Sequence, residues 1–189
     1  MAGGFPAALA SVLAAILLAA CSRNVISVGS VPFPAQKPVF ADASGQPQAG
    51  LPESQEPLRL VLLDYVWCPP CADAWKAIKA ASREIPEGSV RVYRILFDRE
   101  RVISGDGTDE VAPLRLPAPP DAGTLPVTTV VALPRAFKEQ FGPAQAPLLL
   151  LTDRGGKVIK RWAGASSALS ADIANEIKRL SSAPPLLEM

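Results

Sequence analysis

The motif WCPPC at residues 67–71 constrains the fold of this chain more than any other feature. Its two cysteines directly follow a long apolar run, residues 58–66. Two thiols at this spacing lie about one helical turn apart, which suits a reversible disulfide. Zinc knuckles share the spacing, but a structural zinc site normally needs four ligands, and the chain has no histidine and only one other cysteine. The sequence therefore argues against structural zinc.

The remaining cysteine, Cys21, ends a stretch that is typical of an export signal. Residues 7–20 are rich in alanine and leucine, have about the length of a signal-peptide core, and are too short to span about 30 Å of hydrocarbon comfortably. The sequence LAA at residues 18–20, followed by Cys21, resembles the bacterial lipobox, in which the signal is removed and the cysteine becomes a lipid-bearing N-terminus. We therefore expect residues 1–20 to be a lipoprotein signal peptide, although residues 1–6 contain no lysine or arginine.

Two other interpretations of this N-terminus stay open, namely a plain secretory signal cut after Ala20 and an uncleaved anchor. All of them place the rest of the chain outside the cytoplasm, where disulfides persist. The lipoprotein interpretation places it in the bacterial cell envelope, attached to the membrane through Cys21 and facing the periplasm. A net charge of only +1 gives no reason to expect nucleic acid as a partner.

Composition divides the remaining chain into three parts. Residues 21–57 are rich in proline and small polar residues, which predicts a lipid-attached tether. An N-terminal strand or hairpin at residues 25–40 is the alternative. Residues 58–182 are expected to form one globular domain, and residues 183–189 a tail.

The domain begins with a strand, a helix and a second strand. The apolar run from residue 58 predicts a strand that is buried on both faces. A helix is expected at residues 70–84, because Trp75 and Ile78 fall on one side of it. Residues 90–97 are rich in branched and aromatic side chains, which predicts the second strand and hence a right-handed crossover. Residues 98–126 are polar and proline-rich, and we interpret them as an insertion.

The second half of the domain continues the alternation of strands and helices. A short strand is expected at residues 127–131 and a helix at residues 134–141. The two strands of a hairpin follow at residues 148–152 and 157–162. A final helix carries one apolar stripe. That stripe consists of Ile173, Ile177 and Leu180.

A helix that starts at the cysteine pair gives the two thiols different roles. The free N–H groups and the positive end of the helix dipole favour the thiolate of Cys68, so Cys68 is the expected nucleophile. Pro69 and Pro70 suit the first helical turn, where no intrahelical acceptor is available. Cys71 lies one turn further in, ionises less readily and would resolve the mixed disulfide. A static disulfide and a Cu(I) site made by the two thiolates are the alternatives.

These elements together resemble the thioredoxin fold over residues 58–180. A buried strand, WCPPC at a helix start, a second strand, and Ala146-Pro147 leading into a hairpin carry the resemblance. It implies an α/β protein with a central mixed sheet flanked by helices, here with an insertion before the later strand and helix. The Pro-Pro dipeptide, the anchor and the insertion are most similar to the membrane-tethered TlpA/ResA group of bacterial thiol–disulfide oxidoreductases. Members commonly reduce disulfides outside the cytoplasm, including those of apocytochrome c or of copper-site assembly proteins.

The resemblance also implies roles for individual residues. Cys68 matches the attacking cysteine, Cys71 the resolving cysteine, and Pro147 the cis-proline that faces them. A cis bond at Pro147 would turn the carbonyl and amide of Ala146 toward a substrate chain, and Trp67 would offer that chain a flat apolar surface. The redox-active disulfide itself would serve in place of a cofactor, no metal is expected, and the partners would be protein thiols and disulfides of the cell envelope.

Two departures from the group leave the direction of electron flow open. Acids that relay a proton in other members are replaced here by Leu62 and Leu148. Asp64 is the nearest acid and is a possible proton acceptor, although a solvated aspartate at a strand end is the alternative. The short connection from the first strand to Cys68 resembles the periplasmic oxidase group. A protein-disulfide reductase is the favoured expectation, with an oxidase, a Cu(I)-delivery module and an interaction domain as alternatives.

Overall fold

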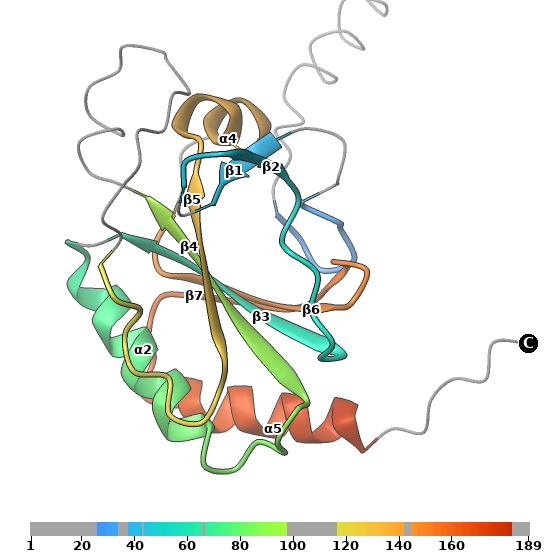
Figure 1. Cartoon of the computed structure of the whole chain (residues 1–189). Helices are drawn as coiled ribbons and strands as arrows, with labels where there is room; N and C mark the ends of the chain where they lie inside the picture. Colours follow the sequence, from blue (N-terminus) through green and yellow to red (C-terminus); the bar gives the residue numbers. More distant parts are fainter. Residues whose placement is uncertain are drawn as a thin grey trace, which may run out of the picture.

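A seven-stranded mixed sheet forms the centre of the computed structural model (Figure 1). The structure describes residues 26–33, 38–42, 44–65, 67–97, 117–141 and 145–182. The strand order across the sheet is β2-β1-β5-β4-β3-β6-β7. The strands are β1 (Pro38–Ala41), β2 (Pro47–Ala49), β3 (Leu58–Tyr65), β4 (Val90–Phe97), β5 (Val127–Ala132), β6 (Leu148–Asp153) and β7 (Val158–Ala163).

The three central strands are parallel and the outer pairs are antiparallel. β3 lies beside β4 with Leu58 opposite Val90, and β4 lies beside β5. On its other side β3 pairs with β6 in antiparallel register, so that Leu63 faces Leu148. β3 is buried along almost its whole length because it is flanked on both sides and covered on both faces. This explains why its sequence is continuously apolar rather than alternating.

Helices cover both faces of the sheet (Figure 1). α2 (Pro69–Ala81) and α5 (Leu169–Ser181) contact each other and pack on the face to which Leu60 and Leu62 contribute. α4 (Pro134–Phe141) lies on the opposite face, where Phe137 joins a second apolar cluster. The mixed sheet flanked by helices that the sequence predicted is therefore confirmed. α2 ends at Ala81 instead of residue 84, because the chain turns after Ser82.

The N-terminal part of the chain differs from the predicted tether. β1 pairs with β5, placing Phe40 opposite Ala132, and β2 pairs with β1. Phe33 and Phe40 are buried in the second apolar cluster, with their ring centroids 5.2 Å apart. The prediction of a tether over residues 21–57 is therefore wrong for the described part of that range. Pro38 and Pro47 are the first residues of β1 and β2, so prolines in this range begin short strands of the sheet.

Residues 26–33 form a strap on the last strand. The Gly29 N–H donates to the Val158 carbonyl at 2.7 Å, and the Val158 N–H donates to the Ser30 carbonyl at 2.8 Å. Ile26 and Phe33 are buried at the two ends of the strap. The domain therefore begins at or before residue 26. Within the described residues, no helix combines the length and the apolar character that crossing a membrane requires.

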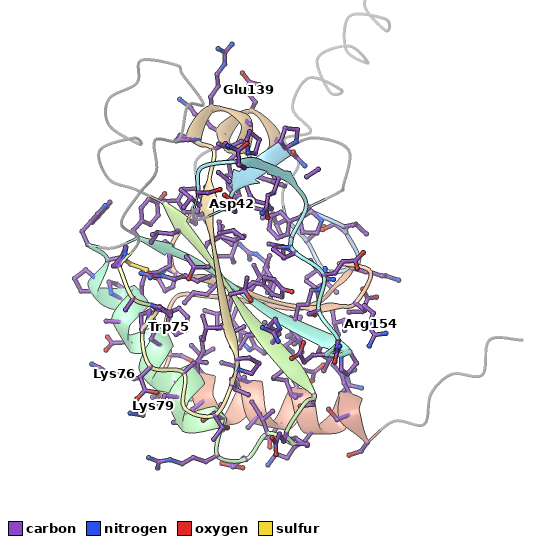
Figure 2. All side chains as sticks on the ribbon, in the orientation of Figure 1. Asp42, Trp75, Lys76, Lys79, Glu139 and Arg154 are labelled. Carbon is purple, nitrogen blue, oxygen red and sulfur yellow. A yellow bond between two sulfur atoms is a disulfide. The ribbon has the colours of Figure 1, made fainter. Side chains whose placement is uncertain are left out.

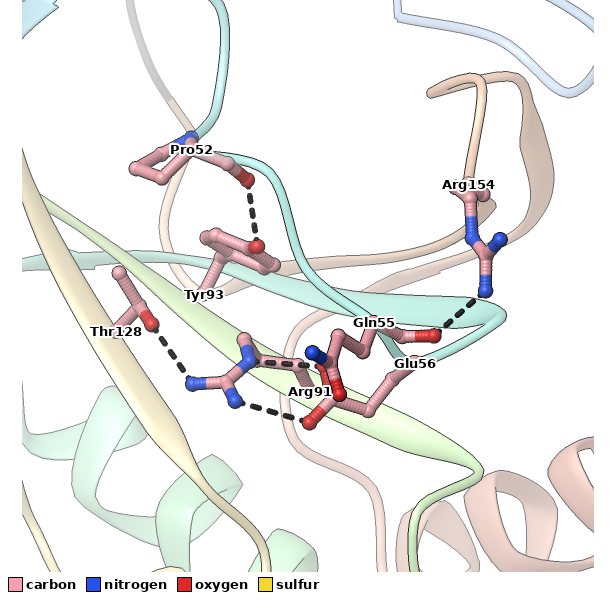
Figure 3. Close-up of polar contacts among 7 residues, drawn as sticks. All are labelled: Pro52, Gln55, Glu56, Arg91, Tyr93, Thr128 and Arg154. Carbon is pink, nitrogen blue, oxygen red and sulfur yellow. Dashed lines mark hydrogen bonds and ion pairs between the residues drawn. The ribbon is translucent and has the colours of Figure 1, made fainter.

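A half-buried ion pair fixes the segment that enters β3 (Figure 3). The contact is bidentate: Arg91 donates from Nε to Glu56 Oε2 at 3.0 Å and from Nη2 to Oε1 at 2.9 Å. Arg91 Nη1 also donates to the hydroxyl of Thr128. The hydrogen bonds from Arg91 lower the pKa of Glu56 below its ordinary value. The charged carboxylate is therefore more stable in the folded chain than in the unfolded chain.

This lowered pKa predicts a pH dependence of stability. The contribution of Glu56 is present above the pKa it has in the unfolded chain, about 4.3, and is lost as the pH falls through the lower pKa of the folded state. We expect wild type to be more stable than Glu56→Gln at pH 7 by about 1 kcal/mol or less. Urea unfolding between pH 7 and pH 3 should show this difference closing on acidification. A difference that widens at low pH would contradict the assignment.

Candidate redox site

The two motif cysteines form a disulfide at the start of α2 (Figure 2, yellow bond). Their Cα atoms are 5.2 Å apart. Cys68 is the N-cap residue of the helix and is half-buried, whereas Cys71 is 1% exposed. Cys68 is therefore the more exposed residue of the two, and the roles of Cys68 as attacking cysteine and of Cys71 as resolving cysteine stay predictions.

The first turn of α2 directs few N–H groups at Cys68. Pro69 and Pro70 occupy the first two helical positions and have no N–H to donate. The Cys71 N–H donates to the Cys68 sulfur at 3.2 Å, and the Cys71 and Ala72 N–H groups reach the Cys68 carbonyl. In the reduced protein a thiolate at Cys68 would keep the Cys71 N–H and the helix dipole as stabilising partners.

Replacing Pro70 with alanine is expected to make the pair more oxidising. The substitution adds one N–H at the helix start, which stabilises the thiolate of the reduced form. The expected rise in reduction potential is about 10–20 mV, measured by equilibration with glutathione buffers. Pro86→Ala, in the turn after α2, is the matched control and should leave the potential unchanged. An unchanged potential in Pro70→Ala would contradict this account.

The bond between Ala146 and Pro147 is cis. Pro147 immediately precedes β6, whose first residue, Leu148, pairs with Leu63 near the end of β3. That end of β3 leads into the cysteine motif, so the structure brings Ala146 and Pro147 to the same end of the sheet as the disulfide. Pro147 is buried and its carbonyl accepts from the Gly164 N–H at 2.9 Å, whereas Ala146 is half-buried. Binding of substrate by these two residues stays a prediction.

Trp67 extends an aromatic stack to the protein surface beside Cys68. Its side chain is 52% exposed, and its ring centroid lies 5.3 Å from that of Tyr65. Tyr65 stacks on Phe97 with centroids 4.9 Å apart, and Phe97 meets Phe137 edge to face. Burial raises the pKa of Tyr65. The exposed indole is therefore held in place by ring contacts with the interior, which suits the predicted contact with a substrate chain.

Asp64 is buried, which excludes a solvated carboxylate at the strand end. The residue is 2% exposed, and its Oδ2 accepts from Arg94 Nε at 2.7 Å and from Trp75 Nε1 at 3.2 Å. Trp75 belongs to α2 (Figure 2), so Asp64 connects β3 and β4 to the helix that begins at the cysteines. Among the described hydrogen bonds, none joins Asp64 to either cysteine. A role for Asp64 as proton acceptor stays a prediction.

Arg94 is the site-associated residue that sequence reasoning missed. It is 3% exposed, lies in the middle of β4, and donates from Nη1 to the Pro117 carbonyl at 3.4 Å as well as to Asp64. A useful signal was present, because a cation in a mostly apolar strand must find a partner if it is buried. Locating that partner required the parallel register, which places Leu62 opposite Arg94 and therefore Asp64 on the same face.

The two cysteine sulfurs are bonded to each other in this structure. In the part of the chain that the structure describes, no three or more Cys, Asp or Glu side chains come together in a way that could hold a metal ion. The predicted lipidation residue, Cys21, lies outside the described residues, as do residues 1–20, 98–116 and 183–189.

No protein-family model and no curated protein sequence matches this chain. Solved structures do match it. A SCO1/SenC family lipoprotein from Bacillus anthracis str. Ames superposes with a TM-score of 0.51 at 19% identity, covering 82% of this chain and 100% of that one. A thioredoxin-like protein from Aeropyrum pernix gives 0.50 at 14% identity, covering 92% and 99%. An uncharacterized thioredoxin-like protein from Porphyromonas gingivalis gives 0.50 at 17% identity, covering 78% and 92%.

These likenesses establish the class of the protein at the level of its fold. The chain has a thioredoxin fold, with a CXXC disulfide at the start of α2 and a cis-proline before β6. Compared with the expectation from the sequence, the domain is extended at its N-terminus by β1, β2 and the strap.

Proposed function

We propose that this protein is an extracytoplasmic thiol–disulfide oxidoreductase that is attached to the membrane through a lipid on Cys21. The observation that carries the proposal is the disulfide of Cys68 and Cys71 at the start of α2, at the same end of the sheet as the cis-proline Pro147. Closing a loop this short contributes little to the free energy of folding, so a purely stabilising role does not explain why the chain has a disulfide at this position.

The favoured direction is reduction of protein disulfides, as the resemblance to the TlpA/ResA group implies. In the reduced enzyme the Cys68 thiolate attacks one sulfur of the substrate disulfide, forms a mixed disulfide and releases the first substrate thiol. The Cys71 thiolate then attacks the Cys68 sulfur and releases the second substrate thiol. Two electrons pass to the substrate, the Cys68–Cys71 disulfide forms, and an external dithiol reductant must regenerate the enzyme.

The site geometry supports this order of events. Cys68 is half-buried and caps the helix, whereas Cys71 is 1% exposed and its sulfur is bonded to that of Cys68. Apocytochrome c or a copper-site assembly protein is the kind of substrate that the resemblance implies. The lipid attachment is supported by the LAA sequence before Cys21, and the similar Bacillus anthracis protein is itself described as a lipoprotein.

Trapping partners in cells with Cys71→Ser tests the proposal. Without the resolving thiol, the mixed disulfide on Cys68 should persist and appear as a discrete adduct that a reducing agent cleaves. The double variant Cys68→Ser/Cys71→Ser is the matched control and should give no adduct. Absence of adducts from Cys71→Ser, together with tight binding of one Cu(I) by the reduced wild type, would favour a delivery module instead.

The direction of transfer requires a separate measurement. A strongly reducing pair should have a reduction potential near that of thioredoxin, about −270 mV, whereas an oxidase should lie near −120 mV. Equilibration of the purified protein with defined thiol buffers distinguishes the two. A potential near about −120 mV would show that the protein acts as an oxidase and not as a reductase, with the roles of Cys68 and Cys71 unchanged.

A further inference from the structure

Two of the exposed large apolar side chains belong to the N-terminal strap. Val28 is 61% exposed and Val31 is 48% exposed, although the strap is held firmly by hydrogen bonds to Val158. The turn at residues 27–30 is also closed locally, because the Ser30 hydroxyl donates to the Ser27 carbonyl at 2.6 Å. The two valines therefore project from an ordered surface, where branched apolar side chains gain nothing from contact with water.

Two cations lie in the β6–β7 turn, which the strap contacts through Val31. Arg154 and Lys157 are exposed, and the Val31 side chain comes within 3.7 Å of the position that a Cβ on Gly156 would occupy. Arg154 donates to the Gln55 carbonyl at 2.6 Å, and no ion pair to a carboxylate is seen for it within the described residues. The one acid in the turn, Asp153, accepts a hydrogen bond through Oδ1 from the backbone N–H of Lys157. We name Val28, Val31, Arg154 and Lys157 the strap patch.

The length of chain before the strap limits how far this patch can be from a lipid attached to Cys21. Ile26 is the fifth residue after Cys21, and a fully extended chain spans at most about 3.6 Å per residue, or about 18 Å in all. The predicted tether would have allowed a far larger separation. With residues 26–33 packed on the domain, the strap is the first described segment after Cys21.

We propose that the strap patch rests on the anionic phospholipid surface of the membrane that holds the Cys21 lipid. This inference rests on the lipid anchor of the proposed function. The apolar valines enter the interfacial layer, and the two cations meet the anionic headgroups. Two cations and two valines bind a bilayer weakly, so the acyl chains provide the attachment and the patch sets the orientation of the domain.

This orientation places the redox site on the side of the domain away from the membrane. The strap lies at the start of β7, beside the turn after β6, whereas the disulfide follows the opposite end of β3 (Figure 1). Arg154 and the disulfide accordingly lie on opposite sides of the domain in Figure 2. β3 has eight residues, so the two ends are separated by about 25 Å. Cys68 then meets partners in the aqueous compartment in preference to groups at the bilayer surface.

The test uses the lipidated full-length protein in vesicles of phosphatidylethanolamine and phosphatidylglycerol. Val28→Cys or the control Ser167→Cys is labelled with an environment-sensitive fluorophore while the Cys68–Cys71 disulfide is intact. Ser167 is exposed and follows β7 at the redox end of the sheet. Brominated lipids should lower the emission of the label at residue 28 about twofold and leave the label at residue 167 unchanged. Arg154→Glu/Lys157→Glu should weaken the quenching at residue 28.

Mass spectrometry of the N-terminal peptide separates the two ways in which the proposal can fail. If Cys21 carries no lipid, the anchor in the proposed function is wrong and this inference falls with it, while thiol–disulfide exchange is untouched. If Cys21 is lipidated but both labels are quenched equally, or neither is quenched, the anchor stands and the orientation is overturned. Quenching at residue 28 that is unaffected by the charge-reversed variant would likewise overturn the role given to the cations.

Discussion

Cys68→Ser is expected to abolish disulfide exchange, with the rate constant for reduction of a peptide disulfide falling on the order of 10³-fold or more. Cys68 supplies the accessible nucleophile, and the shielded Cys71, which is 1% exposed, cannot reach a substrate in its place. Stopped-flow mixing of the reduced protein with a peptide disulfide measures the first step directly. The tryptophan fluorescence of Trp67, beside Cys68, offers a signal for the same reaction.

Cys71→Ser separates attack from resolution. This variant should react once with the peptide at a rate close to that of wild type and stop at a stable mixed disulfide, which mass spectrometry detects. Lys76→Ala is a matched control, because Lys76 is exposed on the same helix and, among the described residues, forms an ion pair with Asp73 alone. It should stay within about twofold of wild type. If Cys71→Ser lost the attack step and Cys68→Ser kept it, the two roles would be reversed.

Arg94→Met is expected to cost about 3–5 kcal/mol of unfolding free energy. Arg94 and Asp64 are ion-paired at 2.7 Å with side chains only 4% and 3% exposed. Removing the guanidinium leaves the Asp64 carboxylate buried without its cation, and methionine cannot donate to it. Urea unfolding with the disulfide intact gives the free energy, and a fall in the unfolding midpoint at unchanged slope identifies a loss of stability.

The same strand provides the control for this prediction. Arg91 lies three positions earlier in β4 and pairs with Glu56, but their side chains are 30% and 11% exposed. Arg91→Met should cost about 1 kcal/mol or less. The double variant Asp64→Leu/Arg94→Met removes both charges and should recover most of the loss seen in Arg94→Met alone. Equal losses in Arg94→Met and Arg91→Met would show that burial of the pair does not determine its contribution.

The sequence predicts the fold well where local patterns and the motif coincide. The apolar run before the cysteines, the helix stripe with Trp75 and Ile78, and the branched strand at residues 90–97 each carry their own signal. The cis bond at Pro147 followed from the resemblance and could not have come from proline content, because cis bonds are rare even before proline.

Two features depend on contacts between distant parts of the chain and could not be predicted in this way. β1 and β2 are only four and three residues long, lie among prolines, and are strands only because β1 pairs with β5 about 90 residues later. The pairing of Arg94 with Asp64 depends on strand register, which the hydrophobic pattern of two nearly all-apolar strands does not specify. In both cases the composition of one segment does not indicate which distant segment it will pair with.

The N-terminal strands and the strap also cover backbone groups at the two edges of the sheet. Without β1, strand β5 would present a free row of backbone donors and acceptors, the usual template for aggregation between chains. The edge is instead β2, which is three residues long and starts with Pro47, a residue that has no N–H. At the other edge, the strap occupies the backbone of Val158, and the rest of β7 carries Lys160 and Arg161. These features keep two copies of this protein from joining their sheets edge to edge.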